Sequence, residues 1–362
     1  MYAFGPNHYV PVLKVKPGEK AAIRRLDPTV VGRVTPLLEL VERKAKPAKK
    51  KGDPDVMPTV DAHLTTAFKG LAAAVAPFER YFLDCREMQG DGAVAAQDAF
   101  SRAAALATPF TPVTSITRTV DVAPALAHRQ HGVAIRLSRE ESEAGVITKG
   151  LPAFLAKHKL SSDEVDLIVD LGAVDQMHAD GVEALASAFL ADVPALTSWR
   201  TLTLSACGFP STMGIVGKND QAQVDRLEWK YWLEVLHAGR GSLPRLPTFS
   251  DCAVQHRDGV EGFDPRTMHA SAAIRFAQDS TWLLVKGESI KLNGGAQFRG
   301  LAGNVVNGAA TGVNGAHCAG CGDLLSAAGG APKFGAPVKW REIGTIHHIT
   351  LTVENLAALP WP

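Results

Sequence analysis

Short runs of β-branched and other apolar residues alternate along the chain with longer stretches in which apolar residues recur at helical spacing. Runs of the first kind are typical of strands in a parallel sheet that is covered on both faces, and stretches of the second kind are typical of the covering helices. The pattern predicts strands at residues 9–16, 34–42, 80–88, 110–118, 132–140, 163–172, 200–208 and 246–254.

A helical pattern or a long connection follows each predicted strand. At the first predicted helix, Pro17 and Glu19 favour a helix start, and at the second we expect Asp61 as the N-cap. Eight strands with this alternation match an α/β fold of the (β/α)8 TIM-barrel-like type better than an open doubly wound sheet. The predicted helices lie at residues 17–26, 61–76, 98–107, 120–130, 147–160, 178–193 and 225–239.

The pattern changes in residues 270–362. Residues 271–276 and 280–287 predict a pair of strands where a simple barrel would have its last helix, and residues 345–353 predict a final strand rich in β-branched side chains. The intervening residues 300–322 are rich in Gly, Ala and Asn, which predicts small helices and loops. We therefore expect one barrel domain over 1–362, with an irregular C-terminal elaboration at 270–362, rather than two independent domains.

Polar side chains recur near the ends of the predicted strands, about one βα repeat apart. The carboxyl ends of barrel strands surround the mouth at which TIM barrels bind ligands. Asp170, which ends the apolar run VDLIVDLG, fits such a position. The candidate ligand-pocket residues at strand ends are Lys14, Glu39, Asp84, Arg136, Asp170, Ser205 and Ser250.

The charged members of this set are compatible with two arrangements. Lys14 and Arg136 could bind a phosphate or carboxylate, while the three acidic residues hold Mg²⁺ or act as acid and base. The same five side chains could instead form a buried ion-pair network without catalysis. An open pocket would favour an enzyme acting on a small phosphorylated or nucleotide ligand, and closed ion pairs would favour a binding protein. No cofactor is identified, because glycine-rich phosphate loops, GxSxG and HExxH are absent from the sequence.

Residues 317–321 (HCAGC) and the adjacent His347 and His348 supply enough ligands for four-coordinate zinc. A single CxxC is a weak signal, however, and neighbouring histidines on a strand point to opposite faces, so at most one would face a shared metal. We therefore predict no metal site and place both histidines among the ligand-pocket candidates. One of them should face the barrel near its mouth, and if it lies beside Asp170 or Glu39, its pKa would be raised.

Composition excludes several classes of protein. With 46% hydrophobic and 21% charged residues the chain is globular, and its net charge of +1 gives no general case for nucleic-acid or membrane binding. Five cysteines argue against a disulfide framework. No apolar run is long enough for a membrane span and no signal-peptide pattern is visible, so we expect a cytoplasmic protein. The basic residues 43–55 predict a flexible polar loop, in preference to a site for a phosphate-rich partner.

Three passages resemble the Beta protein family of satellite phages, prophages and bacterial defence islands. They are YVPVLKVKPGEKAAIRRL with VTPLLELVE, then FLDC, VAIRLS and VDLIVDLG in order, and finally KWREIGTIHHITLTV. The resemblance covers nearly the whole chain, and the first and last passages are the most specific. The basic loop 43–55 and the Gly/Ala-rich residues 300–330 depart from the family pattern.

The resemblance implies a context and no catalytic residues, since the family has no settled enzymatic activity. Beta proteins lie beside a toxic Gop protein and a CII-like DNA-binding regulator, and they are linked to suppression of Gop toxicity in an anti-phage module. The expected partners are therefore a Gop-like effector and a CII-like regulator. A small anionic ligand is a further possibility, and neither a membrane nor direct nucleic-acid binding is expected.

Overall fold

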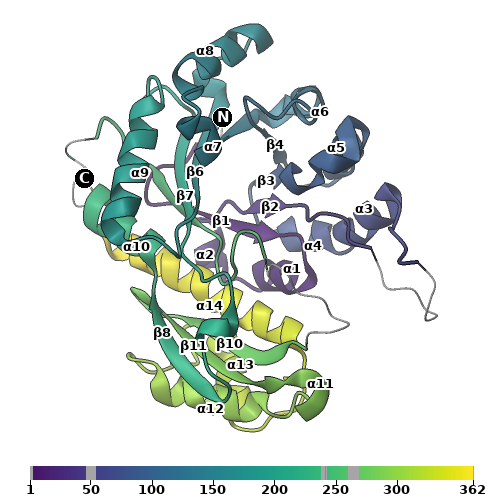
Figure 1. Cartoon of the computed structure of the whole chain (residues 1–362), viewed down its shortest axis with the longest axis vertical. Helices are drawn as coiled ribbons and strands as arrows, with labels where there is room; N and C mark the ends of the chain where they lie inside the picture. Colours follow the sequence, from purple (N-terminus) through teal and green to yellow (C-terminus); the bar gives the residue numbers. More distant parts are fainter. Residues whose placement is uncertain (1–2, 46–53, 238–240, 242, 260–268, 362) are drawn as a thin grey trace.

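The computed structural model describes residues 3–45, 54–237, 241, 243–259 and 269–361, and within them eight parallel strands close into a barrel (Figure 1). Each strand pairs with the next, and the last pairs with the first. The (β/α)8 fold and all eight predicted strands are thereby confirmed. In order around the barrel, the strands are β1 (Tyr9–Lys14), β2 (Leu37–Glu39), β3 (Tyr81–Asp84), β4 (Phe110–Thr114), β5 (Val133–Ser138), β6 (Val165–Ala173), β7 (Thr201–Cys207) and β9 (Thr248–Asp251).

Helices lie against the outer face of the barrel. The helix predicted at 61–76 is divided in two, because Gly70 adopts a left-handed conformation with φ 73°. Thr59, and not Asp61, caps the first of these helices. The helices along the barrel are α1 (Pro17–Arg24), α2 (Pro28–Val31), α3 (Val60–Phe68), α4 (Leu71–Val75), α5 (Gly92–Ala104), α6 (Val122–Ala127), α7 (Arg139–Glu143), α8 (Ile147–His158), α9 (Ala179–Asp192) and α10 (Leu227–Tyr231), which continues as a π-helix over Trp232–His237.

Each barrel strand is buried on both faces, which explains its nearly continuous apolar sequence. Leu13 and Leu38 point outward and belong to the large core shared with the helices. Their neighbours Val12 and Leu37 point inward and belong to a second core inside the barrel. Because side chains alternate along a strand, the polar residue that ends a strand on the inward face lies at the mouth.

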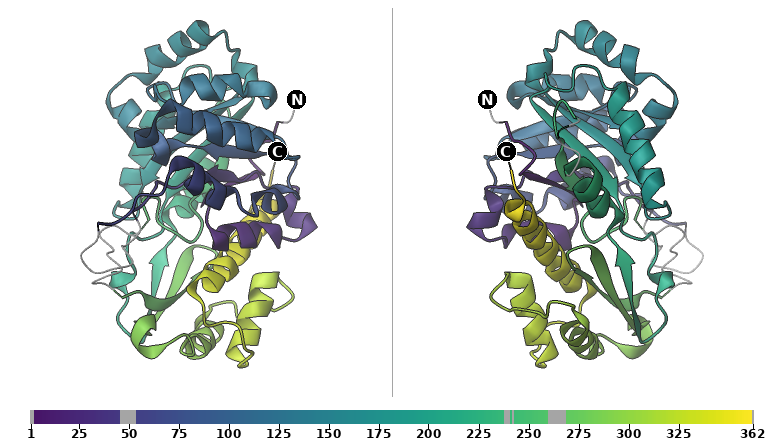
Figure 2. Two further views of the ribbon diagram at one scale, coloured as in Figure 1. Left: turned by 90° about the vertical axis from the view of Figure 1, so that its right-hand side faces the viewer. Right: turned by 90° about the vertical axis from the view of Figure 1, so that its left-hand side faces the viewer.

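A smaller unit lies beside the barrel, at the lower end of the molecule in Figure 1 and in both views of Figure 2. Its antiparallel sheet has the order β10 (Ser271–Ala277), β11 (Thr281–Ser289), β8 (Asp220–Asp225), so the predicted strand pair is confirmed. Strand β8 was not predicted, because its residues are polar and mostly exposed at the sheet edge. The helices of this unit are α11 (Ile290–Asn293), α12 (Phe298–Gly308) and α13 (Ala319–Ala328).

The strand predicted at 345–353 is wrong, because these residues form part of α14 (Pro337–Ala358). Pro337 occupies the first turn, where its fixed φ and missing N–H favour a helix start. Buried residues surround most of the helix, including Ile343, Ile346 and Ile349. A helix that is buried on nearly every side shows no clear 3.6-residue periodicity, and its β-branched content then looks like a strand.

Helix α14 completes the barrel and also joins it to the smaller unit. It packs against α1 and β1 on one side and against β10 and α13 on the other (Figure 2). The inner barrel core also extends to Trp282 and Leu284 of β11. That the chain folds as one domain stays a prediction. Within the described residues, no helix has the length and apolar character needed to cross a membrane.

The predicted basic loop at 43–55 lies largely outside the described residues, which omit 46–53. At its start, Arg43 forms an ion pair with Asp91 and donates a hydrogen bond to the carbonyl oxygen of Pro58 at 2.7 Å. The first residue of this segment is therefore fixed to the barrel.

Candidate functional site

The five charged residues predicted at the mouth lie together inside the barrel. Lys14, Glu39 and Asp84 are register partners at the ends of β1, β2 and β3. Arg136 of β5 and Asp170 of β6 reach the same level from the opposite side of the barrel. All five are at most 4% exposed, so they form a buried cluster, although Lys14 also reaches a cavity described below.

Arg136 is the centre of this cluster. Its Nη1 donates to Glu39 Oε1 at 2.5 Å and to Asp84 Oδ2 at 2.9 Å, and its Nε donates to Asp170 Oδ2 at 2.9 Å. The planar guanidinium presents several donors in a fixed geometry, so one arginine can bind three carboxylates at once. Lys14 Nζ lies 2.5 Å from Glu39 Oε2, which leaves Glu39 between two cations.

Further charges from the loops close the cluster. Arg118 binds Asp84 at 2.6 Å, and Arg257 binds Asp170 at 2.9 Å. Five cationic and five carboxylate side chains are joined by ion pairs of at most 3.5 Å, so their formal charges cancel. We call this set the mouth network: Lys14, Arg86, Arg118, Arg136, Arg257, Glu39, Asp84, Glu87, Asp121 and Asp170.

Half of the mouth network was not found from the sequence. Arg86, Glu87, Arg118, Asp121 and Arg257 all lie in segments that follow barrel strands, where no apolar pattern fixes a side-chain direction. The available signal was their position at or shortly after the carboxyl end of a predicted strand, which places a residue near the mouth but does not identify its partner.

Burial and pairing oppose one another in the mouth network. Desolvation disfavours each charge, and at Glu39 and Asp170 the partner charges outweigh it, whereas at Asp121 burial prevails and raises the pKa. Lys14 and Arg136 hold the pKa of Glu39 well below its usual range, although burial alone would raise it. Burial also acts against the ionised form of Asp170, but Arg136 and Arg257 lower the pKa of this carboxyl to about 2. The carboxylates therefore stay ionised at neutral pH through ion pairing.

Ser205 and Ser250 lie at the same level as Asp170, because Asp170 pairs with Ser205 and Ser205 pairs with Ser250 across β6, β7 and β9. Both are 1% exposed. Within the described residues, the Ser250 hydroxyl has no hydrogen-bond partner. The two serines lie beside the mouth network and are separate from its ion pairs.

The two histidines of α14 do not join the mouth network. His348 points to the outer face of the barrel, where its Nε2 lies 2.8 Å from Asp251 Oδ2 and 3.1 Å from the Tyr9 hydroxyl. The histidine that faces the barrel thus lies beside Asp251, and the condition for a raised pKa, a contact with Asp170 or Glu39, is not met. Burial lowers the pKa of His348, and the nearby Asp251 carboxylate does not reverse this effect.

His347 points away from the barrel, toward the smaller unit. Its ring stacks on Phe276 with centroids 3.9 Å apart, and its Nε2 lies 2.8 Å from the carbonyl oxygen of Ala277. Its Nδ1 lies 3.2 Å from Cys321 Sγ. Successive residues of an α-helix diverge by about 100°, which explains why His347 and His348 face different units.

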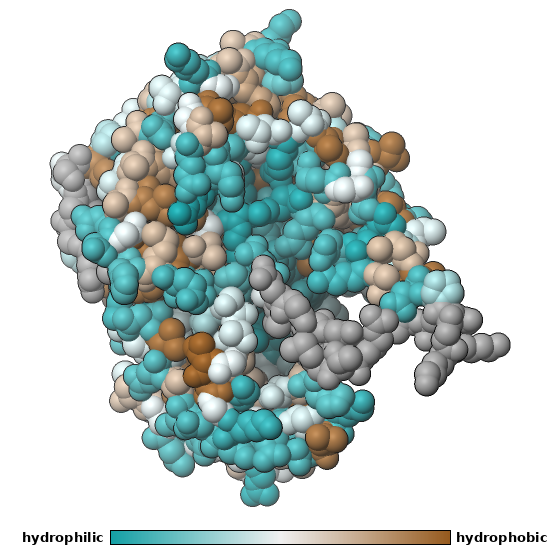
Figure 3. Space-filling model, viewed as in Figure 1, coloured by the Kyte–Doolittle hydropathy of each residue, from teal (hydrophilic) through white to brown (hydrophobic). Residues whose placement is uncertain are grey.

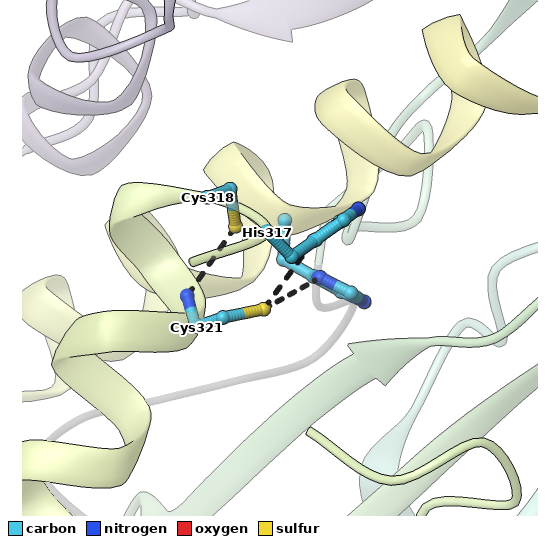
Figure 4. Close-up of side chains that lie close together, drawn as sticks. His317, Cys318 and Cys321 are labelled. Atoms are coloured by element: carbon cyan, nitrogen blue, oxygen red, sulfur yellow. Dashed lines mark hydrogen bonds between the residues drawn. The ribbon is translucent and has the colours of Figure 1, made fainter. Parts of the chain in front are cut away.

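His347 belongs to a cluster with the HCAGC segment. His317, Cys318, Cys321 and His347 each place one ligand atom within 4.8 Å of all the others (Figure 4). His317 and Cys318 precede α13, Cys321 lies in its first turn, and His347 comes from the middle of α14. We call these four residues the Cys/His cluster. As expected, only one of the two adjacent histidines joins the cluster, although they lie on a helix and not on a strand.

A cavity of about 580 Å³ lies beside the mouth network and touches it at Lys14 and Glu87. Lys16, Lys44 and His63 also line it. Hydrophilic residues surround a hollow over the barrel strands in Figure 3. Lys14 binds Glu87 and Lys44 lies 3.0 Å from Glu42, so two of the three lysines have carboxylate partners within the cavity. A small anion would have to compete with these partners.

The fold and site define a (β/α)8 barrel protein whose mouth is closed by balanced ion pairs and whose last helix carries one ligand of a Cys/His cluster. The Beta protein family model matches residues 9–354, nearly the whole chain, and the chain therefore belongs to the Beta protein family. No curated protein matches the sequence significantly.

Proposed function

We propose that this chain is the restraining component of a prophage-encoded, toxin–antitoxin-like anti-phage system, which binds a toxic Gop-like effector until infection is sensed. Membership of the Beta protein family supports the context, and a CII-like regulator is the second expected partner. The observation that favours binding over catalysis is the mouth network. Its ten charges are paired with one another, whereas an active site needs groups that are free to act on a substrate.

The alternative is a TIM-barrel enzyme, or a ligand sensor, for a small phosphorylated or nucleotide ligand. The cavity beside Lys14 and Glu87 favours this second function, because it gives a small molecule access to the edge of the mouth network. The two functions are compatible if ligand binding at this cavity releases the effector.

Co-expression tests the restraint directly. The Gop-like protein from the neighbouring gene is induced in bacteria with this chain, with an empty vector, and with the chain carrying an affinity tag. We expect growth arrest in the absence of the chain, normal growth in its presence, and recovery of a complex from the tagged sample. Phage infection should then restore toxicity. An effector that is equally harmless without the chain, and forms no complex with it, contradicts the proposal.

A matched pair of variants separates restraint from ligand chemistry. Glu87→Gln removes the outer partner of Lys14 at the cavity, and its side chain is 26% exposed, so the fold should tolerate the change. Glu143→Gln is the control, because Glu143 lies on exposed α7 and pairs only with Arg139 within the described residues. If binding alone restrains the effector, both variants protect growth equally. Loss of protection in Glu87→Gln alone, with the complex intact, would favour the ligand-dependent function.

A further inference from the structure

The Cys/His cluster brings four metal-ligating side chains together from two separate segments, residues 317–321 and α14. Cys321 Sγ lies 3.5 Å from His317 Nδ1 and 3.2 Å from His347 Nδ1. In a tetrahedral zinc site, Zn–S and Zn–N bonds of about 2.3 and 2.0 Å place neighbouring ligand atoms roughly 3.3 to 3.8 Å apart. The two contacts of Cys321 thus have about the spacing of a coordination shell, and all four ligand atoms lie within 4.8 Å of one another.

The partners of the two histidines fix which nitrogen faces the cluster. His347 Nε2 contacts the Ala277 carbonyl oxygen at 2.8 Å, and a carbonyl oxygen can only accept a hydrogen bond. Nε2 of His347 therefore carries the proton, and Nδ1 presents its lone pair to Cys321. His317 has the same arrangement, with Nε2 lying 2.8 Å from Glu354 Oε2 and Nδ1 directed at the sulfur. Metal-bound histidines usually have such a carbonyl or carboxylate behind them.

Cys318 has surroundings suited to a thiolate. Cys318 is the N-cap of α13, and its sulfur accepts a hydrogen bond from the Cys321 backbone N–H at 3.3 Å. The ten-residue helix α13 directs its positive end toward this sulfur. Two thiolates and two neutral imidazoles balance the charge of one divalent cation.

We propose that His317, Cys318, Cys321 and His347 bind one Zn²⁺ in a closed, four-coordinate structural site. The ligand set of two sulfurs and two imidazole nitrogens selects zinc over Mg²⁺ or Ca²⁺, which prefer oxygen. Four protein ligands leave no open position for a substrate. The ion therefore has a mechanical role: it fixes α13 and the residues before it to α14, the helix that closes the barrel.

The smaller unit buries little apolar surface, so a metal link between its segments would stabilise it. Its core is small, and residues 309–318, which lead into α13, contain no helix or strand and few large apolar side chains. Small units with limited apolar burial are commonly stabilised by a metal or by disulfides. The cysteines of the cluster are free in the structure, which leaves their sulfurs available to a metal.

The test is the metal content of the full-length chain, purified under reducing conditions after growth with zinc. We expect one zinc per chain by elemental mass spectrometry, and a visible thiolate–cobalt absorption after exchange with Co²⁺. Cys318→Ser combined with Cys321→Ser should abolish both signals, and His317→Ala should weaken binding at least tenfold. Cys85→Ala, which removes a buried thiol of the barrel core, is the matched control and should retain zinc.

Three results would overturn the proposal. One is absence of zinc from the reduced wild-type chain even after zinc is added back. Another is equal zinc content in the double cysteine variant. The third is a Cys318–Cys321 disulfide, seen as a mass deficit of two hydrogens in wild-type protein that binds no metal. The wild-type measurements decide the matter even if a variant does not fold.

Discussion

The mouth network and the Cys/His cluster are both groups of buried polar side chains, but they differ in what completes them. In the mouth network every cation faces a carboxylate, so the protein supplies both halves of each interaction. In the Cys/His cluster two sulfurs and two imidazole nitrogens converge, and all four are of the kind that donates a lone pair to a metal. The first group is complete in the protein alone, and the second requires an ion from outside.

This difference separates stability from binding. Buried ion pairs are costly to assemble, and removing one partner is more costly still, since it leaves an uncompensated charge. A cluster of metal ligands can persist without its ion as a weak hydrogen-bonded group, and it becomes strong only on binding. Substitutions in the mouth network should therefore act on the whole fold, whereas those in the Cys/His cluster should act through metal binding.

The largest effect on the free energy of unfolding is expected for Arg136→Met. The change removes the shared partner of Glu39, Asp84 and Asp170 and leaves three buried carboxylates close together. The free energy of unfolding should fall by about 3–5 kcal/mol, measured by urea denaturation at pH 7.

Arg139→Gln provides the control for this measurement. Arg139 also forms an arginine–carboxylate pair, with Glu143 at 2.7 Å, but both side chains are well exposed. Its loss should cost only about 0.3–0.5 kcal/mol. Similar losses in the two variants would mean that the mouth is far better hydrated than its burial indicates.

The second largest effect is expected from zinc, which should stabilise the smaller unit. With free zinc at 100 times the dissociation constant, binding to the folded state alone stabilises it by about 2.7 kcal/mol. Removal of zinc should therefore expose α13 first, as faster hydrogen exchange at its backbone amides, while the strands of the barrel keep their protection. Uniform changes along the chain would contradict a local role for the ion.

The sequence predicted the barrel well because each strand is buried on both faces. A run such as VDLIVDLG leaves few alternatives to a covered parallel strand, and the inward polar residues at strand ends then follow from alternation. Lys14, Glu39, Asp84, Arg136 and Asp170 were located in this way. Their mutual pairing was not predictable, because either an open pocket or closed ion pairs would give the same pattern.

Prediction from the sequence failed where tertiary packing overrides the local preference for helix or strand. Residues 345–353 carry many β-branched side chains, yet the helix is buried between two units and has no polar face to mark its period. Pro337 at the start and Pro360 beyond the end were the usable signals of a helix. Reading this segment as a strand also concealed the Cys/His cluster, which needs the direction of His347 on a helix.

Acid should weaken the mouth network in a defined pH range. The pKa of Asp170 is lowered to about 2 from an ordinary 3.8, so ionised Asp170 stabilises the fold above pH 4 by about 2 kcal/mol. This contribution is lost as the pH falls from about 4 to about 2. Asp170→Asn should accordingly be less stable than wild type at pH 7, and the two should converge near pH 2.

Urea midpoints between pH 7 and pH 2 provide the measurement. Glu183→Gln, at an exposed position on α9, is the control and should follow the wild-type curve at every pH. A constant difference between Asp170→Asn and wild type down to pH 2 would show that the carboxylate contributes through packing or hydrogen bonding, and not through its charge.

The smallest effect is expected for Glu354, which contacts the Nε2 of the zinc ligand His317, and it should appear in the zinc affinity. This carboxylate lies 2.8 Å from His317 Nε2 and is about half exposed, so it orients the imidazole without being buried itself. Glu354→Gln keeps an acceptor at the same place but removes the charge that makes His317 a better ligand. Zinc affinity, measured by competition with a chromophoric chelator, should fall about tenfold, which is the smallest loss usual for a group that hydrogen-bonds to a metal-bound histidine. The zinc-free chain should keep its stability, because an exposed ion pair contributes at most about 1 kcal/mol. An unchanged zinc affinity would show that His317 does not depend on Glu354, and equal losses of apo stability and zinc affinity would make the contact part of the fold alone.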